Sequence, residues 1–188
     1  MATERAALLL LDVQNGIVNR LENTSQYLQT LSTVTQAARD AQFTIIHVVT
    51  AFRAGHPECN PRNPSMGRVK EMGGFRNNDE STQVHPAVTP REEEPIVTKY
   101  RVSAFTATEL DLILRSIGIT ELVVAGLITS GAVLSTVRAA ADLDYSVTVL
   151  EDGCMDRDLE VHRVLMEKVF TRQARVVSSK EWVNEVGR

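Results

Sequence analysis

The sequence predicts an α/β fold in which a doubly wound, mostly parallel sheet carries helices on both faces, giving three layers. Apolar runs of strand length alternate with segments of helical periodicity along the whole chain, and this alternation is typical of parallel α/β sheets. The run AALLLLDV at residues 6–13 has no polar residue before Asp12. A strand that is apolar on both faces is covered on both sides, so this run belongs in the centre of the sheet.

The other elements follow from the same alternation. A helix over 25–41 comes after the first strand, and Thr24 or Ser25 can cap its start. Further strands are expected at residues 43–50, 94–100, 120–126, 145–152 and 174–179. Further helices are expected at residues 107–117, 131–143, 158–170 and 179–186.

Residues 51–94 interrupt this order. The segment is rich in Pro, Gly, Asn and charged residues and has little periodicity, so we interpret it as a long loop region. A loop of this length inside a compact domain is usually functional or an excursion at an edge. We therefore expect substrate specificity to lie in this segment.

Composition limits the class of protein. The chain has 188 residues, 43% of them hydrophobic, and a net charge of −4 with both signs interspersed. These values predict one globular domain over residues 1–188. We expect no nucleic-acid partner, because the basic residues form no cluster, and no membrane partner, because the first apolar run is too short to span a bilayer. The two cysteines form no disulfide framework, which favours a cytoplasmic location.

Three features fall at the carboxyl ends of predicted strands, where parallel α/β sheets bind ligands. Asp12 follows the first strand, Lys99 ends the third, and the turn Gly126–Ala132 follows the fourth. A carboxylate inside an apolar run is costly to bury unpaired, and Lys99 is its obvious partner. Spacing alone leaves two alternatives open, a functional pair or a structural ion pair, and Asp12 could also cap the next segment.

The motifs LLLLDVQNGI and PIVTKYRVSAF, with GLITSGAV at the start of the predicted helix 131–143, resemble the isochorismatase-like hydrolases. The resemblance implies a six-stranded parallel sheet, a homodimer or larger homo-oligomer, and no cofactor. It also implies that Asp12 and Lys99 match the Asp and Lys of the Asp–Lys–Cys triad of the amidase members. The position of that Cys is occupied by Ala132, whose methyl group cannot form a covalent adduct.

No other residue clearly replaces the missing thiol. Cys59 lies in the long segment and Cys154 follows the fifth strand, so neither matches the triad position. Ser130 and Ser135 have no His nearby in the sequence to serve as base, and we expect their hydroxyls to bond the backbone near the helix start.

The isochorismatases of this family also lack the Cys and hydrolyse a vinyl ether. The resemblance therefore implies a hydrolase acting on a small carboxylate-bearing molecule, with ether hydrolysis favoured over amide hydrolysis. Asp12 would be the acid–base group, and Lys99 with the N–H groups of Gly131 and Ala132 would hold negative charge. Two alternatives stay open: a non-catalytic ligand-binding or scaffold protein, and a Cys amidohydrolase whose nucleophile is replaced by Ala132.

Six further residues are candidates for substrate binding by position or resemblance. Gln14 lies two residues after Asp12, and Arg53, just after the second strand, can meet a substrate carboxylate. Phe105 resembles a pocket wall. The resemblance also places a non-prolyl cis peptide within Leu127–Thr129 and includes the following residues in the site: Ile128, Thr129 and Gly131.

The histidines give little support for a metal site. His56 has no Asp-x-His partner, so we predict no catalytic metal. His47 lies in a predicted strand and is expected to be a satisfied core residue. His85 and His162 are expected at the surface or as caps.

Overall fold

The computed structural model describes residues 5–187, and the ends of the predicted 1–188 domain lie outside this range. Its centre is a six-stranded sheet with the strand order β3-β2-β1-β4-β5-β6. Every pairing between neighbouring strands is parallel, so the predicted doubly wound α/β sheet is confirmed. The strands are β1 (Arg5–Leu11), β2 (Thr44–Thr50), β3 (Ile96–Lys99), β4 (Ile119–Leu127), β5 (Ser146–Met155) and β6 (Arg175–Val177).

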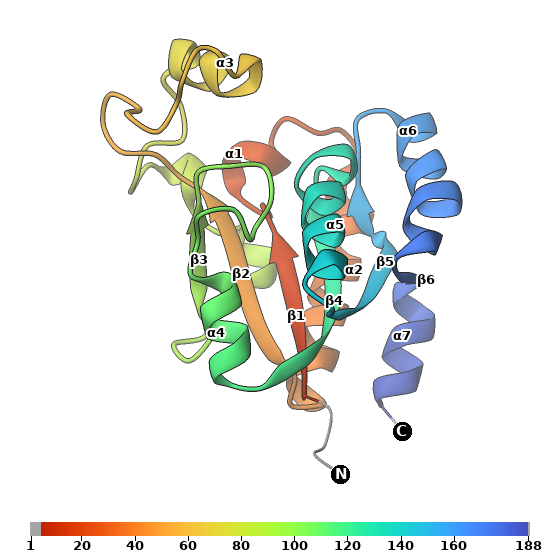
Figure 1. The fold of residues 1–188 in the computed structure, drawn as a ribbon. Coiled ribbons are helices and arrows are strands. Elements are labelled where there is room, and N and C mark those ends of the chain that lie inside the picture. The colour runs from red at the N-terminus through yellow and green to blue at the C-terminus, as the bar shows by residue number, and fades with distance from the viewer. Residues whose placement is uncertain (1–4, 188) are drawn as a thin grey trace.

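Helices cover both faces of the sheet (Figure 1). The principal helices are α2 (Thr24–Asp40), α4 (Leu110–Ser116), α5 (Leu134–Asp142), α6 (Leu159–Val164) and α7 (Ser179–Val186). Short helical segments complete the chain: α1 (Asn15–Val18), α3 (Pro64–Met72), η1 (Glu80–Thr82), η2 (Pro86–Val88), η3 (Thr129–Val133), η4 (Leu165–Val169) and η5 (Phe170–Arg172). Within the described range, no helix is both long and apolar enough to cross a membrane.

Alternate residues of β1 divide the core into two layers. Leu9 and Leu11 pack with buried residues of α4, α5 and η4 on one face. Leu8 and Leu10 pack on the other face with buried residues of α2 and with Trp182 of α7. Successive side chains of a strand point to opposite faces, so the apolar run at residues 6–11 of β1 supplies both layers, as its sequence predicts.

The segment 51–94 differs from its prediction as a long loop, because it contains α3 and the short turns η1 and η2. Asn63 caps α3 by accepting from the N–H groups of Ser65 and Met66, Pro64 begins the helix, and Gly73 ends it in the left-handed conformation. These are ordinary start and stop signals. Figure 1 shows α3 standing apart from the sheet, beyond the carboxyl ends of β1 and β2.

Candidate active site

The strand order places the predicted site at the switch point of the sheet. The order of the strands reverses between β1 and β4. From β1 the chain proceeds outward to β2 and β3, and from β4 it proceeds outward to β5 and β6 on the other side of the sheet. Doubly wound sheets bind ligands outside the carboxyl ends of their strands at this point. Asp12 directly follows β1, and the turn that leads to Ala132 directly follows β4.

Asp12, Thr50 and Lys99 form a closed hydrogen-bonded group across the ends of three neighbouring strands. The Lys99 ammonium lies 2.9 Å from Oδ2 of Asp12 and donates to Oγ1 of Thr50 at 2.7 Å. The Thr50 hydroxyl in turn donates to Oδ1 of Asp12 at 3.0 Å. The side chains of Lys99 and Asp12 are only 4% and 8% exposed. Both carboxylate oxygens therefore have donors, and the pair that was expected from spacing is present.

The third donor of Lys99 also has a partner within the protein. An ammonium has three N–H donors, and Nζ of Lys99 donates to the Arg101 carbonyl at 3.2 Å besides its contacts with Asp12 and Thr50. No N–H of Lys99 is left for an oxyanion in this arrangement. In this arrangement Lys99 holds Asp12, and its predicted contact with substrate charge stays a prediction.

The backbone around Asp12 is closely constrained. Asp12 has a φ of 54°, in the left-handed region that non-glycine residues seldom adopt, and its N–H donates to Val48 O at 2.8 Å. On the neighbouring strand, Gly126 has a φ of +136°, and a Cβ there would lie 2.1 Å from Leu11 O. Only glycine allows β4 to approach β1 so closely beside Asp12.

The turn after β4 is fixed by the following strand and helix. The peptide bond between Leu127 and Ile128 is cis, which confirms the expectation for this turn. Ser130 N–H donates to Oδ2 of Asp156 at 2.7 Å, and Oγ1 of Thr129, which is fully buried, lies 2.8 Å from Nδ1 of His162. Asp156, directly after β5, and His162 of α6 thus hold the turn that leads into α5.

Ala132 lies in this turn, 3% exposed and in contact with the apolar core. Gly131 N–H donates to Ile128 O at 2.9 Å, so that donor is already engaged. We therefore expect the Ala132 N–H to be the group of this turn that binds an anion. This role stays a prediction. Ile128 is partly buried and packs against the core layer that contains α2.

Three other candidate residues are placed as follows. Gln14 is fully buried, and its amide joins the end of β2 to the 80–85 segment by bonds to Thr50 N, Thr50 O and Thr82 O. Arg53 forms an ion pair with Glu58. Phe105 packs beside Tyr145, with ring centroids 5.9 Å apart. Contact of any of them with substrate stays a prediction.

Neither cysteine is suited to attack a substrate. Cys154 is buried in the core, and burial raises the pKa of its thiol to about 12. Cys59 is buried among Phe52, Met66 and Phe75, and burial raises its pKa as well. Because the thiolate is the reactive form, both groups are poor nucleophiles at neutral pH.

The histidines are distributed over separate environments. Among residues 5–187, no group of three or more His, Cys, Asp or Glu side chains is arranged to hold a metal. His56 Nε2 contacts the Gly74 carbonyl, and His85 accepts from Ala87 N–H as a cap, as expected. His47 is buried but only half satisfied, because its Nδ1 has no hydrogen-bond partner within the described part of the chain.

Three residues that shape this site are not identified by the sequence pattern. Thr50 bridges Asp12 and Lys99, but a threonine that ends a strand is common. Asp156 and His162 reach the turn after β4 from 26 and 33 residues away. Such contacts between distant segments leave no local pattern, although an Asp at the end of a strand is a weak signal.

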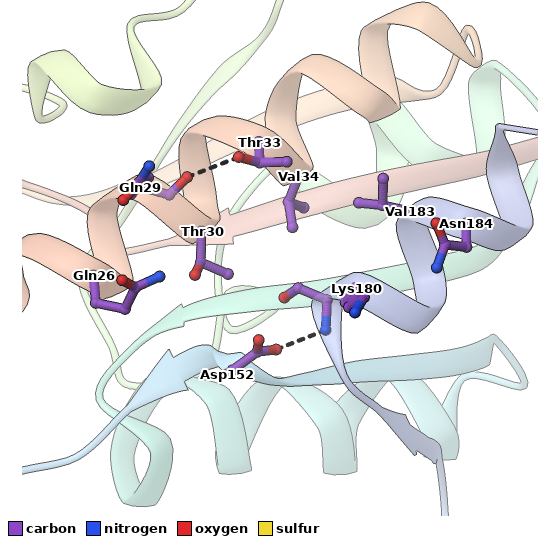
Figure 2. A pocket seen from close by; sticks show the side chains of 10 residues that line it. Gln26, Gln29, Thr30, Thr33, Val34, Asp152, Lys180, Val183 and Asn184 are labelled. Atoms are coloured by element: carbon purple, nitrogen blue, oxygen red, sulfur yellow. Dashed lines mark hydrogen bonds between the residues drawn. The ribbon is translucent and has the colours of Figure 1, made fainter.

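A separate groove of about 510 Å³ lies between α2 and α7 (Figure 2). Polar side chains such as Gln29, Asp152 and Lys180 line most of it. It shares no residue with the group formed by Asp12, Thr50 and Lys99, so we do not assign it to the predicted site.

The strand order and the buried carboxylate–ammonium pair define an α/β protein with a candidate site at the switch point of its sheet. A family model described as the isochorismatase domain matches residues 6–181. The chain belongs to this family of hydrolases.

Individual relatives agree with the family assignment. The chain is 30% identical over 179 residues to the ureidoacrylate amidohydrolase RutB of Klebsiella pneumoniae, covering 81% of this chain and 74% of that protein. It is 25% identical to the secreted isochorismatase effector Isc1 of Verticillium dahliae, covering 96% and 91% of the two chains. The crystal structure of a cysteine hydrolase from Pseudomonas syringae superposes with a TM-score of 0.87 at 22% identity, covering 97% and 92%, which shows the shared fold.

Proposed function

We propose that this chain hydrolyses a small carboxylate-bearing substrate with Asp12 as the acid–base group and without a covalent thiol intermediate. The observation that carries the proposal is the closed group of Asp12, Thr50 and Lys99 at the switch point, beside a turn whose residue 132 is an alanine. A positioned carboxyl group can transfer protons, whereas a methyl group can form no adduct.

The substrate that fits this chemistry best is an enol ether such as isochorismate. Protonated Asp12 donates its proton to the terminal vinyl carbon, and the resulting oxocarbenium ion takes up water at the ether carbon. The Asp12 carboxylate accepts the proton of that water, and the hemiketal collapses to pyruvate and a diol. The relative Isc1, which is named an isochorismatase, supports this choice of substrate.

In this mechanism Lys99 and Thr50 position Asp12. Their three hydrogen bonds fix both carboxylate oxygens of a largely buried side chain. General acid catalysis contributes a factor of about 10²–10⁴ when the proton donor is held in place. The Ala132 N–H is the proposed donor to the substrate carboxylate.

The relative RutB supports a second candidate function, because it is named an amidohydrolase. On that reading the chain has the framework of a Cys amidohydrolase with alanine at the nucleophile position. The Ala132→Cys variant would then hydrolyse an amide such as ureidoacrylate, and released ammonia would be the readout. A third candidate, a non-catalytic binding protein, predicts ligand-dependent thermal shifts without any product.

The experiment for the first candidate is incubation of purified protein with isochorismate and measurement of pyruvate. Turnover that is lost in Asp12→Ala supports the proposal, and turnover no higher than that of the variant removes it. Assembly as a homodimer or larger oligomer, a cytoplasmic location and activity without a cofactor are parts of the same proposal. Size measurement in solution, cell fractionation and assay of metal-free protein test them.

A further inference from the structure

Arg53, the residue predicted to meet a substrate carboxylate, already holds a carboxylate of the protein. Its guanidinium forms an ion pair with Oε1 of Glu58 and lies over the ring of Tyr100, 5.3 Å from the centroid. The Arg53 side chain is 62% exposed, while that of Glu58 is 11% exposed. The exposed Arg53 guanidinium is thus paired with a Glu58 carboxylate that is largely buried.

This ion pair is attached to the predicted active site by direct contacts. Tyr100 and Arg101 follow Lys99 in the chain, and the Arg101 carbonyl accepts a hydrogen bond from Nζ of Lys99. Nη1 of Arg101 donates to the Glu58 carbonyl at 3.2 Å and to the Tyr100 carbonyl. Arg53 itself lies three residues beyond Thr50. The Arg53–Glu58 pair therefore lies at the edge of the group that holds Asp12.

We propose that Glu58 occupies Arg53 in place of a substrate carboxylate and is displaced when an anionic substrate binds. The proposal rests on the proposed function, which requires a carboxylate-bearing substrate. Two features support exchange. The Arg53 end of the pair is 62% exposed, and ion pairs of exposed side chains contribute little net stability. Oε2 of Glu58 has no hydrogen-bond partner among residues 5–187, so the guanidinium is held through Oε1 alone.

The exchange gives the site a preference for anionic substrates. A substrate carboxylate can accept from the guanidinium through both of its oxygens, whereas Glu58 accepts through Oε1 alone. A neutral amide of the same shape offers no such replacement, and it must leave the Arg53–Glu58 pair in place. Glu58 thereby acts as a specificity-determining residue through competition, because discrimination arises from what each ligand must displace.

The test measures binding of benzoate, with benzamide as its neutral counterpart, by NMR titration of the full chain. The Glu58→Gln variant is expected to bind benzoate about two- to fivefold tighter, which corresponds to removal of a competing exposed ion pair. Its affinity for benzamide is expected to be unchanged. Arg53→Gln is expected to lose the preference for benzoate, and the double variant is expected to match Arg53→Gln.

Glu181→Gln is the matched control, because it breaks an exposed ion pair with Arg175 beside β6, at the opposite edge of the sheet from β3. It should leave both affinities unchanged. Any one of three results overturns the proposal. They are an unaltered benzoate affinity in Glu58→Gln, a gain in benzoate affinity that persists in the double variant, and no benzoate binding in any variant. This experiment measures binding and no turnover. If the expected affinities are found but the protein releases no pyruvate from isochorismate, only the proposed function is rejected and the exchange at Arg53 stands.

Discussion

Two buried carboxylates lie at opposite ends of β3, and they differ in what surrounds them. Glu94 lies two residues before the first residue of this strand, and Asp12 contacts Lys99, the last residue. Both are buried and both pair with a cation. Burial and pairing alone therefore do not distinguish a candidate catalytic carboxylate from a structural one.

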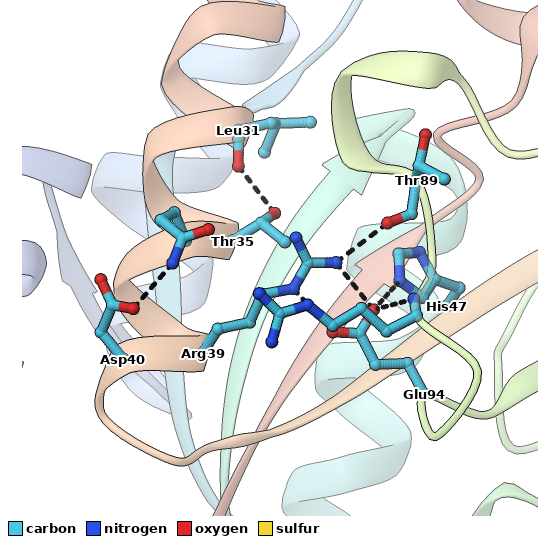
Figure 3. A network of polar contacts seen from close by, with 9 residues as sticks. Leu31, Thr35, Arg39, Asp40, His47, Thr89 and Glu94 are labelled. Carbon is cyan, nitrogen blue, oxygen red and sulfur yellow. Dashed lines mark hydrogen bonds and ion pairs between the residues drawn. The ribbon is translucent and has the colours of Figure 1, made fainter.

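The Glu94 network connects structural elements (Figure 3). Its carboxylate accepts from Nε and Nη2 of Arg39 on α2, from Arg91 N–H and from Nε2 of His47 on β2. Burial alone would raise the pKa of Glu94, but the bonds from Arg39, Arg91 and His47 lower it to about 2. This carboxylate stays ionised and fully occupied at neutral pH.

The Asp12 network lies instead at the carboxyl edge, beside the switch point and a turn that leads into a helix. Asp12 also has a left-handed backbone, and its only side-chain partners are Thr50 and Lys99, among the interactions described for residues 5–187. Position in the sheet and local backbone, rather than the ion pair itself, distinguish the predicted active site. Four predictions test this distinction.

Glu94→Gln should cost about 3 kcal/mol of unfolding free energy, because breaking a buried pair leaves Arg39 without its counter-ion. Turnover per folded molecule should stay within about twofold of the wild type, since small effects are expected from a change outside the site. Urea unfolding followed by the fluorescence of Trp182, with turnover assayed in parallel, measures both. A large loss of turnover in the folded variant would contradict the structural role of Glu94.

The pH dependence of stability should report Glu94 directly. Its pKa in the folded state is about 2, below the ordinary value of 4.5, so the ionised form is stabilised on folding. This contribution is complete above about pH 4.5, is lost as the pH falls toward 2, and amounts to about 3 kcal/mol. Wild type should lose that much more stability than Glu94→Gln between these pH values. Parallel curves for the two proteins would show that another group is responsible.

Thr50→Val should reduce turnover about tenfold and stability by about 1–3 kcal/mol, because it leaves a buried N–H and a carboxylate oxygen unsatisfied. Thr50→Ser keeps the hydroxyl, and its turnover should stay within about twofold of the wild type. Such a small difference is expected when a substitution removes no hydrogen bond. Steady-state kinetics separates the effects, since loss of positioning lowers kcat more than it raises KM. If Val and Ser behave alike, the hydroxyl does not position Asp12.

Tyr27→Phe is the smallest change, and it concerns a buried polar group with no network. The Tyr27 hydroxyl is buried in the core and has no hydrogen-bond partner among the residues that the structure describes, and burial raises its pKa well above the ordinary value. Removing it should leave stability unchanged or increase it by up to about 1 kcal/mol. A loss above about 1 kcal/mol in thermal or urea unfolding would indicate a partner for the hydroxyl.

The sequence predicts much of the fold because the alternation of apolar runs is strong. The apolar run at residues 6–11 predicts a central position for β1, and the strand ends place Asp12 and Lys99 at the same edge of the sheet. Helix α3 is missing from that prediction because its nine residues carry weak periodicity, although Asn63, Pro64 and Gly73 mark its ends. A short helix that packs on little core is hard to identify by pattern.

The candidate site is predictable only in part. Asp12 and Lys99 carry charge at strand ends, so their contact can be expected. Thr50, Asp156 and Glu58 act through contacts that depend on three-dimensional approach, and their sequence context resembles that of ordinary surface or strand residues. The saturation of Lys99 by three acceptors is likewise visible only in the structure.

The most direct measurement is pyruvate release from isochorismate by the wild type and by Asp12→Asn, which keeps the size of the side chain but cannot exchange its proton in the same way. The account predicts turnover by the wild type and a loss of about 10²–10⁴ in the variant, while thermal unfolding shows that the variant is folded. Wild type without turnover, or a folded variant as active as the wild type, would contradict the central role of Asp12.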